Sequence, residues 1–233
     1  MSDLQESPKN PDRVLVKRRA GRALRQAGRT HLADLGLRPA RSSPRQWLGD
    51  RNWWLINVEF QSSSWSVGSY LNVGVQYLWI VTDRRSFGHV NCRVPIPGCG
   101  QFVDLEGTED GVHTNADAVG RAARDAVQDL TGHWRDGDSH LNWLTRETGA
   151  GLWQSFDAAI ASGLLAHGSD ASGRFVAIQR DLDRRIGWQN TLAADCEHLA
   201  ELALSPSQFR GEINNRIAVS RQRLKLPLAS HRL

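Results

Sequence analysis

The chain has 233 residues, of which 40% are hydrophobic and 23% charged, and its formal net charge is +4. This length fits one large or two small domains, and the composition is that of an ordinary globular protein rather than a disordered or fibrous one. No membrane-spanning helix is expected, because the longest apolar stretch, 73–81, is far shorter than the about 20 residues that a span requires.

The first predicted elements are a tail and a helix. Residues 1–12 are polar, and we expect them to form a disordered tail. Helical spacing of the apolar positions predicts a helix over 13–35, which Gly36 ends, and a proline-containing loop follows over 37–45. The residues near one face of this helix are Leu24, Ala27, His31 and Leu35.

The most strand-like part of the chain is 51–82. Two runs of alternating residues flank a polar break at 61–64, which predicts an antiparallel hairpin. Asn57 and Asn72 lie in the polar rows of the two strands. They could pair across the sheet, or one of them could point into a binding site, and we favour pairing. The apolar rows are Trp54, Ile56, Val58 and Phe60, then Leu71, Val73, Val75 and Tyr77.

Two further strands are expected after the hairpin. Alternation over 89–94 predicts a third strand, and 101–105 predicts a short fourth one. Polar side chains of the third strand would extend the polar rows of the hairpin. The resulting candidate binding face consists of His89, Asn91, Arg93, Asn57 and Asn72.

The motifs up to this point resemble a known family. They are Leu35-Gly36-Leu37-Arg38, then Trp47, then WWLINVEFQSSS, then GSYLNVGVQ. In this order they are similar to a bacterial family of uncharacterised proteins, domain of unknown function 4304, over roughly residues 14–130. The stretch 89–93 departs from the Cys-His-Trp order of that family. The resemblance implies an α+β domain, and it implies no established activity and no catalytic residues.

The second half of the chain is predicted to be helical. After an acidic loop at 106–112, Thr114 or Asn115 would cap a helix with Asp117 in its first turn, and Ser139 would cap a short helix ending at Gly149. Helical spacing then continues over 152–226 and predicts three or four helices. The last of these begins at the capping box Ser205-Pro-Ser-Gln208.

These elements predict an α+β fold. We expect a mainly antiparallel sheet of three to five strands, with helices on one face and a helical C-terminal extension. The expected domains are an α+β domain over 13–150 and a helical extension over 151–233.

Charge is distributed unevenly along the chain. Residues 9–45 carry eleven basic and two acidic residues, 210–233 carry six and one, and 46–209 carry twelve and twenty. The helix at the N-terminus could therefore bind phosphates, or it could dock on the acidic body of the same chain. We favour docking, because the helix lacks the aromatic residues that stack on nucleic-acid bases. The candidate phosphate-binding side chains are Arg18, Arg22, Arg25 and Arg29.

No motif names a reaction. The sequence lacks the nucleophile elbow, the phosphate-binding loop, the dinucleotide fingerprint and the paired-histidine zinc motif. Two clusters, an acidic one at 104–113 and a His/Asp one at 133–140, are better explained as an exposed loop and a turn. We therefore expect no catalytic residue, no metal and no cofactor.

A cytoplasmic location is expected. The first residues contain no apolar signal segment, and three cysteines (Cys92, Cys99 and Cys196) fit no disulfide framework. Cys92 and Cys99 alone would make a poor zinc site.

Three hypotheses for function follow. The first is a non-catalytic bacterial protein of immunity or defence type, which binds another protein and no membrane. The alternative is a nucleic-acid-associated protein that uses its basic N- and C-terminal helices. The third is an enzyme with a site near His89, Arg93 and His113. The sequence does not set the oligomeric state.

Overall fold

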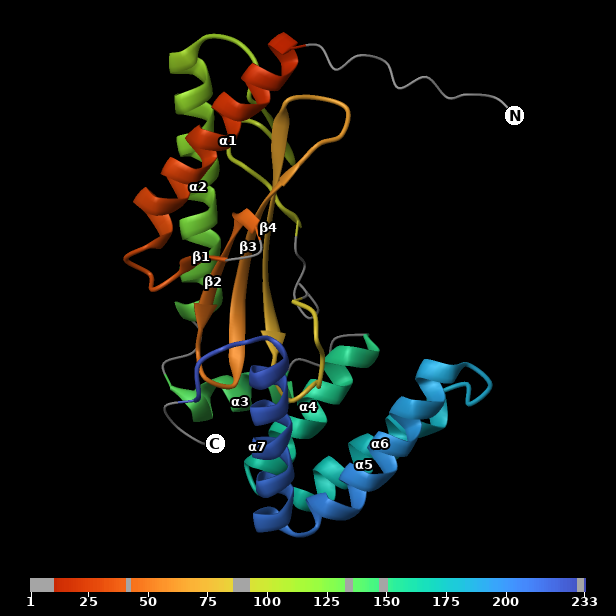
Figure 1. Cartoon of the computed structure of the whole chain (residues 1–233). Helices are drawn as coiled ribbons and strands as arrows, with labels where there is room; N and C mark the ends of the chain where they lie inside the picture. Colours follow the sequence, from red (N-terminus) through yellow and green to blue (C-terminus); the bar gives the residue numbers. More distant parts are fainter. Residues whose placement is uncertain (1–10, 41–42, 86–92, 133–135, 147–150, 230–232) are drawn as a thin grey trace, which may run out of the picture. The chain divides into compact units, whose positions relative to one another are not determined.

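The computed structural model describes residues 11–40, 43–85, 93–132, 136–146, 151–229 and 233. Within these residues the α+β fold is confirmed, with seven helices and one sheet of six strands (Figure 1). The strands are β1 (Arg38–Ala40), β2 (Ser43–Asp50), β3 (Trp54–Ser62), β4 (Gly68–Tyr77), β5 (Arg93–Val94) and β6 (Phe102–Asp104). The helices are α1 (Pro11–Leu32), α2 (Glu109–Gly132), α3 (Gly137–Arg146), α4 (Leu152–Leu164), α5 (Gly168–Asp181), α6 (Gly187–Ala203) and α7 (Pro206–Arg223).

The sheet is antiparallel and has the order β1-β2-β3-β4-β5, with β6 also paired to β4. The predicted hairpin corresponds to β3 and β4. β5 and β6 pair with successive parts of β4, since Leu71 lies opposite Val94 and Ser69 lies opposite Val103. The prediction of a loop over 37–45 was wrong, because β1 and the start of β2 form there and raise the strand number to six.

The chain divides into two compact units. Unit 1 comprises the described residues within Met1–Asp50, Ile56–Gly74 and Val90–Val127, and unit 2 those within Arg51–Leu55, Val75–His89 and Gln128–Leu233. The strands β3 and β4 therefore contribute to both units. The described residues 128–132 and 136–146, which we expected in the α+β domain, fall in unit 2.

In unit 1, α1 and α2 lie side by side along one face of the sheet (Figure 1). Two glycines permit this close packing. A Cβ atom on Gly28 of α1 would lie 2.4 Å from the Trp47 ring of β2, and one on Gly120 of α2 would lie 2.5 Å from the His31 ring. The buried side of α2 otherwise consists of alanine and valine residues.

The predicted starts of α2 and α3 were wrong. α2 begins at Glu109, so the stretch expected to be an acidic loop forms its first turn, and the Thr108 hydroxyl accepts a hydrogen bond from the Gly111 amide. α3 begins after Asp136, whose carboxylate accepts the Ser139 amide while the Ser139 hydroxyl accepts the Asp136 amide. This reciprocal pair is a capping box, so Asp136 is the capping residue there.

Unit 2 contains α3 to α7. The region 152–226 forms four helices, within the predicted range, and α4, α5, α6 and α7 pack on one another. Their core includes the rings of Phe156, Phe175 and Phe209, which meet at centroid distances of 5.7 and 6.3 Å. Across the described residues, no helix combines the length and the apolar character needed to cross a membrane.

Candidate functional site

The candidate binding face on the sheet is a network of hydrogen-bonded side chains in unit 1. The Asn72 amide donates to Glu59 at 3.1 Å and to the Gln61 side-chain oxygen at 3.0 Å, and Arg93 donates to the same oxygen at 3.1 Å. The Arg93 guanidinium also lies 4.0 Å from the centre of the Tyr70 ring, at cation–π distance. The polar groups of this face therefore already bind one another.

The five predicted residues of this face have different surroundings. Asn57 and Asn72 are buried, with 3% and 6% of their surfaces exposed, and Arg93 is half-buried. His89 and Asn91 lie outside the described residues. No direct hydrogen bond between Asn57 and Asn72 is seen, since Asn72 pairs with Glu59 and Gln61 instead.

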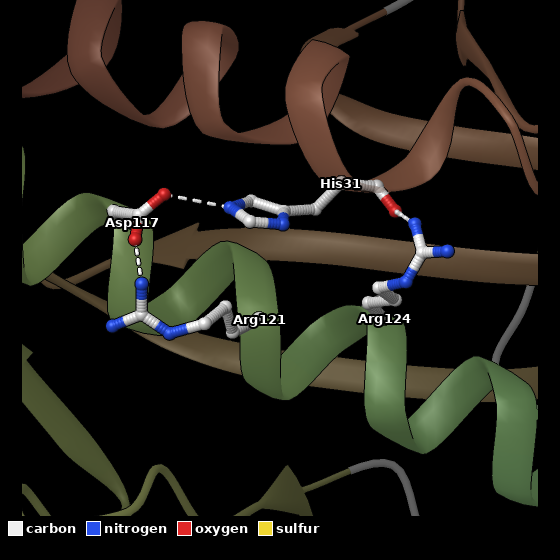
Figure 2. Close-up of polar contacts among 4 residues, drawn as sticks. All are labelled: His31, Asp117, Arg121 and Arg124. Atoms are coloured by element: carbon white, nitrogen blue, oxygen red, sulfur yellow. Dashed lines mark hydrogen bonds and ion pairs between the residues drawn. The ribbon is translucent and has the colours of Figure 1, made fainter.

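A second cluster joins α1 to α2 and was not predicted (Figure 2). His31 Nε2 lies 2.6 Å from Asp117 Oδ1, and Arg121 binds the other oxygen of Asp117. Arg124 donates to the His31 backbone carbonyl at 3.2 Å and to Asp34 at 2.8 Å. Asp117 lies two turns inside α2 rather than in its first turn. The cluster thus fixes α1 against α2.

The electrostatics of this cluster favour a neutral imidazole. Burial lowers the pKa of His31, and the neighbouring Arg121 and Arg124 guanidiniums lower it further. The carboxylates of Asp34 and Asp125 raise the pKa of His31, but they do not outweigh burial and the two guanidiniums. The neutral ring then donates its Nε2 hydrogen to Asp117. The hydrogen bond between His31 and Asp117 fixes both side chains, so its role is to hold α1 and α2 together.

The basic face of α1 is exposed. Arg18, Arg22 and Arg29 are exposed and Arg25 is half-buried. In the described part of the chain, no ion pair engages any of these four guanidiniums. The predicted docking of this face on acidic residues of the same chain is therefore not seen among the described residues.

The basic C-terminal helix α7 differs, because Arg210 and Arg221 are engaged inside unit 2, whereas Arg223 is exposed. Arg210 donates to the Leu164 carbonyl at 2.8 Å, and Arg221 donates to the carbonyls of Pro227 and Asn52 at 2.7 and 2.6 Å. Arg221 is buried, with 4% of its surface exposed. The side chains of Arg210 and Arg221 thus serve packing inside unit 2.

Unit 2 contains a groove of about 870 Å³. Residues after β4 and residues of α4, α6 and α7 line it, and the lining is mostly apolar. Trp188, with 53% of its surface exposed, stacks on Trp153 at a centroid distance of 6.4 Å. Exposed tryptophan beside a groove is typical of binding surfaces. The apolar lining residues are Ile80, Val81, Trp153, Phe156, Trp188, Leu192, Ala194 and Val219.

A charged cluster adjoins the apolar part of the groove. Arg216 makes two hydrogen bonds to Asp195, at 2.7 and 2.5 Å, and a third to Glu212 at 2.7 Å. Burial opposes the charge of Arg216, but these carboxylates outweigh burial and raise its pKa. Asp195 and Glu212 together exceed the charge of Arg216, so this end of the groove is negative and suits a partner cation.

The other predicted titratable residues have varied surroundings. His133 lies outside the described residues, and His140 is buried with its ring 3.0 Å from the Tyr77 hydroxyl. Burial lowers the pKa of His140 to about 3 and raises that of Cys196 to about 12. Among the described residues, no three His, Cys, Asp or Glu side chains are grouped to hold a metal. Cys99 is exposed, and Cys92 lies outside the described residues.

Comparison with known protein families, with curated proteins and with solved structures finds no match.

Proposed function

We propose that the protein is a non-catalytic, cytoplasmic bacterial protein of immunity or defence type, which binds another protein through the groove of unit 2. The observation that carries this proposal is the exposed Trp188, stacked on Trp153 at the edge of an apolar groove of about 870 Å³. Tryptophan is enriched among the residues that dominate binding energy in protein interfaces. The resemblance to domain of unknown function 4304 stays a prediction, and it would concern mainly unit 1.

The groove favours an amphipathic helix of the partner as its occupant. A groove bounded by helices accepts the apolar face of a further helix, with anchors spaced three or four residues apart. The negative end formed by Asp195, Glu212 and Arg216 favours a lysine or arginine beside those apolar anchors. Arg216 is held by both carboxylates, so it orients the site rather than binding an anion.

The test is a selection of helical peptides from a library of bacterial protein fragments. Each selected peptide is measured against the full chain, a Trp188→Ala variant and a Leu204→Ala variant, because Leu204 is exposed in the same unit but does not line the groove. Truncating a dominant tryptophan costs at least about 2 kcal/mol, so we expect roughly 30-fold weaker binding for Trp188→Ala and little change for Leu204→Ala. Peptides that bind all three proteins equally would contradict the proposal.

A second candidate function is nucleic-acid binding through α1. The observation that favours it is the absence of ion pairs on Arg18, Arg22, Arg25 and Arg29 among the described residues. Binding to a duplex and to a single strand, measured by fluorescence anisotropy at two salt concentrations, should then weaken steeply with salt. The triple variant Arg18→Gln/Arg22→Gln/Arg29→Gln removes three possible phosphate contacts. The slope of log affinity against log salt concentration should therefore become shallower by about three. A flat salt dependence would eliminate this candidate.

A further inference from the structure

Unit 1 contains a small pocket at the N-terminal half of α1. Its volume is about 70 Å³, and it is bounded by α1, by β2 and by the turn between β3 and β4. The hydrogen bond from Arg13 to the Trp65 carbonyl, at 2.6 Å, holds that turn against α1. The polar side chains that line the pocket are Lys17, Arg45, Ser62, Ser63 and Ser66.

Positive charges gather at this pocket, and the one carboxylate that contacts its lining, among the described contacts, is that of Glu106, which accepts the Val67 amide at 3.4 Å. A Cβ atom on Gly21, which lines the pocket, would lie 3.6 Å from an Arg25 guanidinium nitrogen and 3.8 Å from one of Arg45. Within the described ranges, no ion pair engages Lys17, Arg25 or Arg45. The Arg25 and Arg45 guanidiniums therefore lie near the same point, where their like charges repel, so an anion bound beside Gly21 would lower the energy of the site.

The turn supplies hydroxyl donors to the same space. The Ser63 hydroxyl oxygen accepts the backbone amides of Trp65 and Ser66, at 3.1 and 3.3 Å, which fixes the turn and leaves the Ser63 hydrogen free to donate. The hydroxyl groups of Ser62 and Ser66 line the pocket beside it. Guanidinium and hydroxyl donors that converge in this way match the oxygens of a tetrahedral oxyanion.

The geometry points to a binding site for one phosphate group, either free phosphate or the terminal phosphate of a small molecule. A cavity of about 10–15 Å³ already holds one water molecule, so a pocket of about 70 Å³ has room for a tetrahedral oxyanion. The site differs from the exposed arginine face of α1, because it encloses a single anion instead of following a polyanion. The phosphate site shares no residue with the groove of unit 2, so an experiment that refutes one of the two proposals leaves the other untouched.

The experiment is calorimetric titration of the full chain with inorganic phosphate and with phenyl phosphate, at constant ionic strength in a chloride buffer. Arg45→Gln should weaken binding about tenfold or more, because it removes a charge-assisted hydrogen bond. Arg180→Gln is the matched control, since Arg180 is exposed on α5 and makes no ion pair among the described residues. Tighter binding of phenyl phosphate would assign the site to a small phosphorylated molecule, and equal binding would assign it to free phosphate.

The Gly21→Ala variant tests whether phosphate binds inside the pocket or is only attracted to the positive charge of the surface. The added methyl group fits without a clash, since its nearest neighbour lies at 3.6 Å, yet it occupies the floor of the pocket and changes no charge. We expect Gly21→Ala to weaken phosphate binding several-fold while the protein unfolds at an unchanged or higher temperature. The proposal is overturned if the wild-type chain binds neither ligand at about 10 mM, or if Gly21→Ala and Arg45→Gln bind as well as Arg180→Gln.

Discussion

Replacing Gly28 by alanine tests how closely α1 packs on the sheet. The new Cβ atom would lie 2.4 Å from Trp47 Cε2 and 2.5 Å from Cζ2, far inside normal contact distance. The indole ring of Trp47 is rigid and only 1% exposed, so it cannot move aside without shifting its neighbours. Overpacking of this kind costs about 1–3 kcal/mol.

Gly21→Ala provides the reference for this prediction. Both glycines lie in α1, and both substitutions gain about 1 kcal/mol in helix propensity. A Cβ atom on Gly21 meets its nearest neighbour at 3.6 Å, so this substitution adds no clash. The difference between the two variants is therefore the cost of the clash alone.

Urea unfolding of the two variants measures that difference. We expect Gly28→Ala to be less stable than Gly21→Ala by about 1–3 kcal/mol, with a melting temperature several degrees lower. Equal stability would refute the close packing of α1 on Trp47, and with it the position of the α1 surface described above.

Two further predictions concern unit 2. Asp195→Ala should cost about 3 kcal/mol, because it leaves the largely buried Arg216 without its bidentate partner. Asp183→Ala, which breaks the exposed pair with Arg185, should leave stability nearly unchanged. Equal urea midpoints for the two variants would contradict this prediction. Because burial lowers the pKa of His140 to about 3, the unfolded chain takes up a proton before the folded one as pH falls below 6.5. Unfolding free energy should then be lower at pH 5 than at pH 7 by up to about 2 kcal/mol from this residue, and a His140→Gln variant that keeps the full wild-type pH dependence would disprove it.

The sequence predicted those elements whose signal is local. The alternation of residues in β3 and β4 reflects two faces of one sheet, and the spacing of apolar residues over 152–226 reflects buried helix faces. The start of α2 was missed because its first turn contains Glu109 and Asp110, which resemble an exposed loop although acidic residues are favourable there. β1 was missed because Pro39 argues against a strand, yet prolines are tolerated at a sheet edge.

The candidate sites were harder to predict because they depend on residues far apart in the chain. His31 and Asp117 are separated by 86 positions, and no periodicity links them. The groove combines helices from different parts of unit 2, although one signal was available: Trp188 lies at the start of a helix, one turn before Leu192 of its buried stripe. The convergence of Arg25 and Arg45 beside Gly21 likewise appears only when α1 packs on β2.

The shared strands β3 and β4 have a consequence for dissecting the protein. The chain passes five times between the two units, so no single cut yields either of them intact. Trp53, Tyr77 and Trp79 form a stack with centroid distances of 4.7 to 6.0 Å, and the His140 ring covers Trp53 at 4.6 Å. A fragment ending at residue 127 would keep these three aromatic rings but lose His140, which packs on them. The fragment would therefore expose an apolar surface that favours aggregation. If an activity were mapped with deletion fragments, its loss would reflect aggregation of the fragments rather than removal of a functional residue. Single substitutions in the intact chain avoid this problem.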